Sequence, residues 1–137
     1  MEAWDIIVVG DGPAALRAAS AAAKQGASTL MVAVNALGST AGAGREGLAA
    51  SIQESNNRGH REDTIRNGGF LSDQDIVANR TAEAVRTLDL LERWGVNFRR
   101  DSSGLPHVSK AIGHGKPRVA DSGDATGREG QKTLEEQ

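Results

Sequence analysis

VVGDGPAALRAAS, residues 8–20, decides the fold of this chain. The apolar run IIVV stands between Asp5 and Gly10, and Pro13 opens a stretch of strong helix formers. A continuous β-branched run bounded by glycine is typical of a parallel strand that is buried on both faces. These residues predict a central strand over 5–10, a tight turn, and a helix over 13–25.

A second apolar stretch over 28–34 follows the helix, so the chain is predicted to begin with a right-handed βαβ unit and a parallel sheet. Gly10, Gly12 and Ala15 form the pattern GxGxxA between strand and helix. Gly10 would make the turn, Gly12 would let a diphosphate approach the backbone, and Ala15 would keep the helix close. The pattern indicates a dinucleotide, the alternative being an ordinary glycine turn.

The acidic residue that often binds the ribose at the end of the second strand is missing. Ala33 occupies the expected position, and Val34 follows it.

The length, net charge and residue composition of the chain exclude several classes of function. A chain of 137 residues predicts one domain, and its net charge of −2 does not favour nucleic acid as a partner. The absence of Cys excludes thiolate metal sites, and the three His residues lack zinc spacing, so no metal is expected. With no apolar run of about 20 residues, we expect no direct membrane span. The expected location is the cytoplasm, with any membrane association through partner subunits.

The middle of the chain predicts one long helix. Residues 35–47 are glycine-rich and predict a loop, residues 48–52 could begin a short helix, and residues 51–63 are polar and expected at the surface. Ser72 can cap a helix, and Asp73 and Asp75 place negative charge at its first turn, which we assign to structure rather than catalysis. The apolar face of this helix comprises Val77, Ala84, Leu88 and Leu91, and Gly95 ends it.

The last third predicts less regular structure. Residues 96–98 predict a short strand or extended piece, residues 99–104 a turn, and residues 105–119 an irregular segment. Asp124 or Thr126 could cap a final helix.

Five stretches together resemble the flavoprotein subunit of succinate dehydrogenase and fumarate reductase, a family that includes L-aspartate oxidase. They occur in the family's order with roughly its spacing, and they are VVGDGPAALRAA, LGSTAGAGREGLAAS, DTIRNGGFLSDQD, EAVRTLDLLERWGVNFRRDSSG and GHGKPRVADSGDATGRE. The resemblance implies a Rossmann-like, FAD-binding α/β fold. It also implies that residues 1–137 form the N-terminal portion of an incomplete flavoprotein domain, without the capping domain and C-terminal parts.

FAD rather than NAD is the cofactor that this resemblance implies, with the pyrophosphate at residues 10–15 and the flavin near residues 39–47. The implied cofactor-binding residues are Gly10, Gly12, Pro13, Ala14, Ala15, Ala33, Val34, Ser39, Thr40, Gly44, Arg45 and Gly47. Respiratory members carry a flavin-linked His where this chain has Thr40, so noncovalent FAD is expected.

Several charged residues are implied to lie near the flavin or substrate. Arg45, followed by Glu46, could assist a dicarboxylate or weaken flavin packing. His114, in IGHG, resembles the family's glycine-His segment near the flavin, the alternative being a loop His bonded to backbone. Arg118 and Asp124 are at least as well explained as a surface ion pair or a helix cap.

The implied reaction is hydride exchange between flavin and a C4 dicarboxylate, succinate or fumarate. The family's catalytic Arg and His residues lie outside this sequence. The chain is therefore expected to be a fragment or one piece of a split subunit, inactive alone, with exposed apolar edges. Its partners would be the remainder of the flavoprotein or an iron–sulfur subunit. Two alternatives are L-aspartate oxidase and a noncatalytic nucleotide-binding or assembly module.

Overall fold

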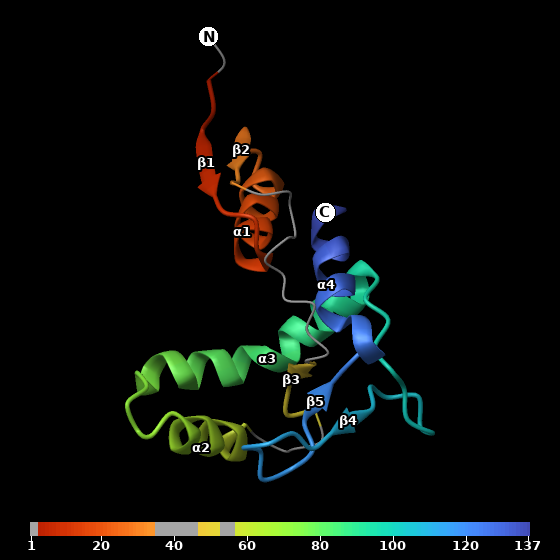
Figure 1. Cartoon of the computed structure of the whole chain (residues 1–137). Helices are drawn as coiled ribbons and strands as arrows, with labels where there is room; N and C mark the ends of the chain where they lie inside the picture. The colour runs from red at the N-terminus through yellow and green to blue at the C-terminus, as the bar shows by residue number, and fades with distance from the viewer. Residues whose placement is uncertain (1–2, 35–46, 53–56) are drawn as a thin grey trace.

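The computed structural model describes residues 3–34, 47–52 and 57–137, and its first part is a βαβ unit (Figure 1). Strands β1 (Ile6–Val9) and β2 (Thr29–Val32) pair in parallel, with Ile6 opposite Thr29. Helix α1 (Pro13–Lys24) connects them and packs against both. The predicted strand–turn–helix–strand order is confirmed, with the helix ending one residue earlier than expected.

The two strands are more exposed than their sequence predicts. Ile7 is 60% exposed and Val9 is 80% exposed, so the expectation that β1 is buried on both faces is wrong for the described residues. The reason is that, among the described residues, β1 pairs with β2 alone in a two-stranded sheet, which is packed against α1. An apolar sheet surface is therefore left uncovered.

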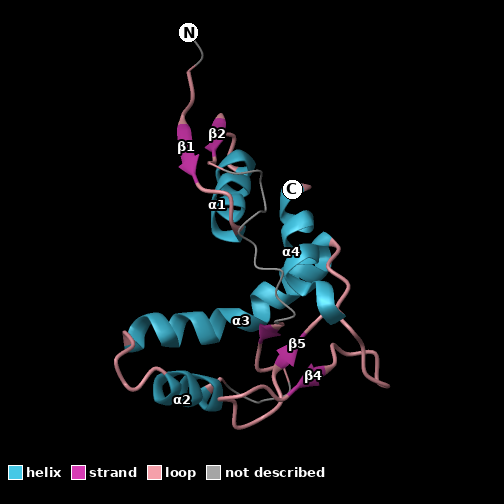
Figure 2. Cartoon of the chain, viewed as in Figure 1, coloured by secondary structure: helices cyan, strands magenta, loops and turns pink. Residues whose placement is uncertain are grey.

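A second, antiparallel sheet lies in the other part of the molecule (Figure 2). It consists of β3 (Leu48–Ala49), β5 (Val119–Ala120) and β4 (Val108–Ser109), in that order. A short helix from residue 48 was predicted wrongly, because Leu48 and Ala49 pair with β5 and fix the backbone as a strand. The segment predicted to be irregular, residues 105–119, supplies β4 and the start of β5.

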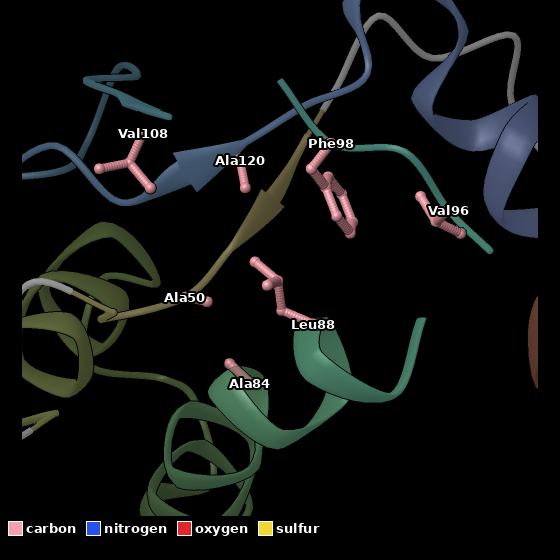
Figure 3. Packing of buried hydrophobic residues seen from close by; sticks show 7 residues of the cluster. All are labelled: Ala50, Ala84, Leu88, Val96, Phe98, Val108 and Ala120. Atoms are coloured by element: carbon pink, nitrogen blue, oxygen red, sulfur yellow. The ribbon is translucent and has the colours of Figure 1, made fainter. Parts of the chain in front are cut away.

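Helices α2 (Arg58–Asn67) and α3 (Gln74–Trp94) pack against each other, and α3 also packs against β3. The predicted apolar face of α3 is confirmed, since Val77, Ala84 and Leu88 are buried. The core forms where this face meets the antiparallel sheet and the extended segment that follows α3 (Figure 3). Its members are Ala50, Ala84, Leu88, Val96, Phe98, Val108 and Ala120.

Local capping sets both ends of α3. Asp73, rather than the predicted Ser72, is the N-cap, because its Oδ1 accepts hydrogen bonds from the N–H groups of Asp75 and Ile76 at 3.0 and 3.1 Å. Gly95 ends the helix in a left-handed conformation with φ +115°, as predicted. The structural assignment of the two aspartates agrees with these contacts.

The C-terminal segment joins the two parts of the molecule. A short 3₁₀ turn, η1 (Gly123–Ala125), precedes α4 (Thr126–Glu135), which packs against α1 and α3. The predicted caps are wrong: Asp124 lies within η1, and Thr126 Oγ1 accepts from the N–H of Ser122 instead of capping α4. Lys24 of α1 lies 4.4 Å from the ring centre of Trp94 in α3, which adds a cation–π contact.

In the described ranges, no helix is both long and apolar enough to cross a membrane. The same residues contain no group of three acidic or His side chains placed to hold a metal ion.

Candidate functional site

The turn between β1 and α1 brings the glycine pattern to the carboxyl end of the parallel strands. Gly10 N–H donates to Val32 O of the neighbouring strand at 2.9 Å, and the φ of Gly10 is +142°, a conformation that favours glycine. A Cβ on Gly10 would lie 3.2 Å from the Cβ of Ala15. Gly10 and Ala15 are thus both small because the helix begins close against the strand.

The N-terminus of α1 is built to accept negative charge. Gly12 is the N-cap, in an extended conformation, and Pro13 opens the helix. The first intrahelical bond runs from Leu16 N–H to Gly12 O at 3.1 Å, so the N–H groups of Ala14 and Ala15 precede it. No acidic residue occupies the first turn. Backbone donors and the positive end of the helix dipole together fit the diphosphate of a dinucleotide.

The other implied cofactor residues divide into two sets. Ala33 directly follows β2 at the same sheet edge as Gly10, and Val34 next to it is 99% exposed. Ser39, Thr40, Gly44 and Arg45, together with Glu46, lie outside the described residues.

Gly47 has a structural reason to be glycine. A Cβ at this position would lie 2.1 Å from the backbone oxygen of Ala120 and 2.6 Å from Val119 Cγ1. No side chain fits there while the start of β3 lies against β5.

A groove of about 700 Å³ lies beside this sheet and begins at Gly47. Its lining includes the polar side chains of Lys110, His114 and Asp121 as well as the apolar Ile112 and Val119. The pKa of Asp121 is lowered, primarily by a hydrogen bond from Arg99 at 2.7 Å. A groove with both polar and apolar walls at the end of residues 35–46 can receive a planar ligand with hydrogen-bonding edges.

A buried ion pair lies behind His114. Arg118 is 1% exposed, and its Nη1 donates to Asp63 Oδ2 at 2.6 Å. Gly115 N–H donates to the same oxygen at 2.6 Å. These two hydrogen bonds hold the pKa of Asp63 below its ordinary value, and the bond from Arg118 has the larger effect. The predicted surface placement is therefore wrong for Asp63 and for Arg118, because each of these two charges is buried against the other, whereas Arg58, Arg61 and Glu62 are exposed as predicted.

His114 is held by the same guanidinium. Nη1 of Arg118 lies 3.1 Å from Nδ1 of the His114 ring, and the rings of His60 and His114 have centres 5.7 Å apart. The alternative of a loop His whose side chain bonds to backbone is not what the structure shows. Asp124, in contrast, is exposed and belongs to η1.

The glycines that flank His114 allow α2 to approach closely. Gly113 O accepts from Asn67 Nδ2 at 2.5 Å, and a Cβ on Gly113 would lie 2.7 Å from that nitrogen. A Cβ on Gly115 would lie 3.2 Å from Asp63 Oδ2. Asp63 and Asn67 were not predicted as site residues. Their spacing of four, on one face of a helix in an otherwise polar segment, is the signal that could have found them.

Comparison with known proteins agrees with this geometry. The model of the FAD binding domain family matches residues 5–137, which is nearly the whole chain. The 8-methylmenaquinol:fumarate reductase flavoprotein subunit of Wolinella succinogenes is 33% identical over 132 residues, covering 90% of this chain and 21% of its own length. The L-aspartate oxidase of Streptomyces coelicolor is 35% identical over 138 residues, covering 98% of this chain and 24% of its own length.

Solved structures show the same fold. An E. coli quinol fumarate reductase FrdA structure has a TM-score of 0.91 and 29% identity to this chain. The match covers 97% of this chain and 23% of the FrdA chain. The structure of Mycobacterium smegmatis Sdh1 in complex with UQ1 has a TM-score of 0.89 and 32% identity to this chain. The match covers 97% of this chain and 23% of the Sdh1 chain. This chain spans about a fifth to a quarter of the relatives' length. It belongs to the FAD binding domain family, whose cofactor is FAD and whose members similar to this chain are fumarate reductase flavoproteins and L-aspartate oxidases.

Proposed function

We propose that this chain supplies the FAD-binding part of a flavoprotein that exchanges a hydride with a C4 dicarboxylate, the pair succinate and fumarate. The observation that carries the proposal is the N-terminus of α1, where two backbone N–H groups precede the first helical bond beside a glycine turn. FAD, when bound, supplies the two-electron chemistry.

The chain's own residues hold and orient this cofactor. Ala14 and Ala15 donate their N–H groups to the diphosphate, Gly12 leaves its approach open, and Gly10 with Ala15 keeps the helix at the strand. Ala33 and Val34 lie at the same sheet edge for the adenosine half. Binding is noncovalent, because Thr40 offers a hydroxyl where a flavin-linked member carries a His.

Residues nearer the flavin act on the substrate side. Ser39, Gly44 and Arg45 precede Gly47 in the sequence, and Gly47 lines the groove, so we place the flavin ring toward that end. Arg45 and His114 are the residues that we assign to the flavin or the dicarboxylate. The charges that hold both substrate carboxylates, and the group that moves the proton, come from sequence beyond these 137 residues.

L-aspartate oxidation is a second candidate. Its support is the 35% identity to the Streptomyces coelicolor enzyme over 98% of this chain, and the 34% identity to an L-aspartate oxidase of Agrobacterium fabrum. Aspartate is also a C4 dicarboxylate, so the FAD-binding residues have the same role in both reactions: they bind and orient FAD.

The uncovered surface of β1 and β2 supports a partner for this chain. Ile7, Val9, Val32 and Val34 are all exposed, and contiguous apolar surface of this kind is usually covered in the assembled protein. We place the remainder of a flavoprotein there. An iron–sulfur subunit then carries electrons in the fumarate reductase candidate, and the whole operates in the cytoplasm or at a membrane through that partner.

A pair of chimeras tests the proposal. Residues 5–137 replace the matching segments of the Wolinella succinogenes flavoprotein and of the Streptomyces coelicolor oxidase, and each purified protein is examined for flavin absorbance. We expect both chimeras to retain FAD, with flavin bleaching by succinate in the first. Because each host supplies the substrate-binding charges, bleaching by aspartate in the oxidase chimera without bleaching by succinate in the fumarate reductase chimera favours the second candidate. Colourless protein from both contradicts the FAD-binding role.

A further inference from the structure

The contact between Arg118 and His114 determines which ring nitrogen carries the proton. Nη1 of Arg118 has two hydrogens, and it lies 2.6 Å from Asp63 Oδ2 and 3.1 Å from His114 Nδ1. A guanidinium can only donate. Nδ1 of His114 must therefore be the acceptor, which places the ring proton on Nε2.

We infer that Asp63 and Arg118 are positioning residues that hold His114 as an Nε2–H donor at the groove, for an acceptor oxygen of the flavin or of the dicarboxylate. His114 lines the groove, and its Nε2 has no hydrogen-bond partner within the part of the chain that the structure describes. The identity of the ligand rests on the proposed function; the positioning does not.

The surroundings of Asp63 and Arg118 explain why this pair can hold the His114 ring in one orientation. Arg118 is 1% exposed and Asp63 is 8% exposed, so water competes little for either charge. Gly115 N–H occupies the same carboxylate oxygen as Arg118, and Asn67 holds Gly113 O. The backbone on both sides of His114 is thus fixed to α2, and the ring is fixed by the arginine.

Gly113 and Gly115 contribute to the same positioning of His114. Side chains at Gly113 or Gly115 would meet Asn67 or Asp63 at 2.7 and 3.2 Å and separate the loop from α2. The motif IGHG therefore places the His114 ring at the groove wall between two residues that have no side chain.

The first measurement is the tautomer of His114 in the chain without cofactor. Long-range ¹H–¹⁵N spectra of ¹⁵N-labelled protein separate the two neutral tautomers, and His114→Gln identifies the signals. We expect the Nε2–H form in the wild type. We expect a smaller fraction of the Nε2–H form in Arg118→Lys, which keeps the charge, with far-ultraviolet circular dichroism confirming the fold. An Nδ1–H form, or a mixture, in the folded wild type overturns the inference whatever FAD does.

The second measurement identifies the ligand oxygen. FAD is added first and succinate second, FAD binding being followed independently by quenching of flavin fluorescence. A shift of the Nε2 signal with FAD assigns the contact to flavin, and a shift only after succinate assigns it to the dicarboxylate. Bound FAD with no shift from either addition overturns the donor role while leaving the proposed function intact. Unbound FAD with the expected tautomer contradicts the proposed function and leaves the positioning.

Matched substitutions give a third readout. The amide nitrogen of Gln lies near the position of Nε2, and that of Asn lies near Nδ1. His114→Gln should therefore keep the affinity for the ligand identified above, whereas His114→Asn should lose about three- to tenfold, the effect of one hydrogen bond. Equal loss in both variants, with both folded, contradicts a role for Nε2.

Discussion

The two halves of the candidate site are built in different ways. The turn of residues 10–15 uses backbone groups and small side chains that adjoin in the sequence, and it lies beside exposed strands. The cluster around His114 uses buried side chains from segments 55 residues apart, as Asp63 and Arg118 show. The first half depends on local geometry, whereas the second depends on the folded core. Substitutions should therefore affect binding in the first and stability in the second.

The largest effect is expected at Arg118. Arg118→Met leaves the buried Asp63 with only the longer ion-pair contact to the exposed Arg66, at 3.4 Å, so the free energy of unfolding should fall by about 3–5 kcal/mol. Urea titration followed by circular dichroism measures it. The matched control is Arg93→Met, because Arg93 is 73% exposed in its ion pair with Asp89 and should cost no more than about 1 kcal/mol. Equal losses would mean that the buried pair contributes no more than a surface one.

Gly47 should show the next largest effect. Gly47→Ala places a methyl group against the backbone of β5, so β3 and β5 must move apart at a cost of about 1–3 kcal/mol. Gly130→Ala is the control, because a Cβ there meets nothing within 4 Å and lies inside α4, where alanine stabilises a helix by up to about 1 kcal/mol. Thermal unfolding should move in opposite directions for the two variants; a common direction would refute the close approach at Gly47.

The cap of α3 gives a smaller and purely local effect. Asp73→Ala removes the acceptor of two backbone N–H groups and should lower the free energy of unfolding by about 1 kcal/mol. Ser72→Ala should change it by less than about 0.5 kcal/mol. Chemical denaturation of the two variants side by side checks which residue is the cap, and a larger loss at Ser72 would restore the sequence prediction.

Acid should weaken the buried cluster in a defined range. The pKa of Asp63 in the folded chain lies below its ordinary value of 3.8, so its contribution is complete above that value and is lost as the pH falls through the lowered pKa. Asp63→Asn should therefore flatten the fall in stability between pH 7 and pH 3. Denaturation midpoints at the two pH values measure this, and an unchanged pH dependence would show that the carboxylate is not stabilised by Arg118.

Sequence patterns predicted what is local. The order of IIVV, GxGxxA and an alanine-rich helix was sufficient for the βαβ unit, and Gly95 for the end of α3. The buried ion pair was not predictable in this way, because nothing adjoining Asp63 or Arg118 indicates that the two meet. The same applies to β3, whose two residues are a strand only because β5 lies beside them. The exposure of Val9 could not be predicted either, because the sequence of an apolar strand does not show how many other strands pair with it.

The central claim is that the N-terminus of α1 binds the diphosphate of FAD, and the affinity of the purified chain for FAD relative to riboflavin tests it most directly. Riboflavin lacks the diphosphate and adenosine, so FAD should bind at least about tenfold more tightly. Gly12→Val should abolish the difference by obstructing the approach to the backbone, whereas Ala18→Val, on the exposed face of α1, should preserve it. Equal affinity of the wild-type chain for both ligands would contradict the claim.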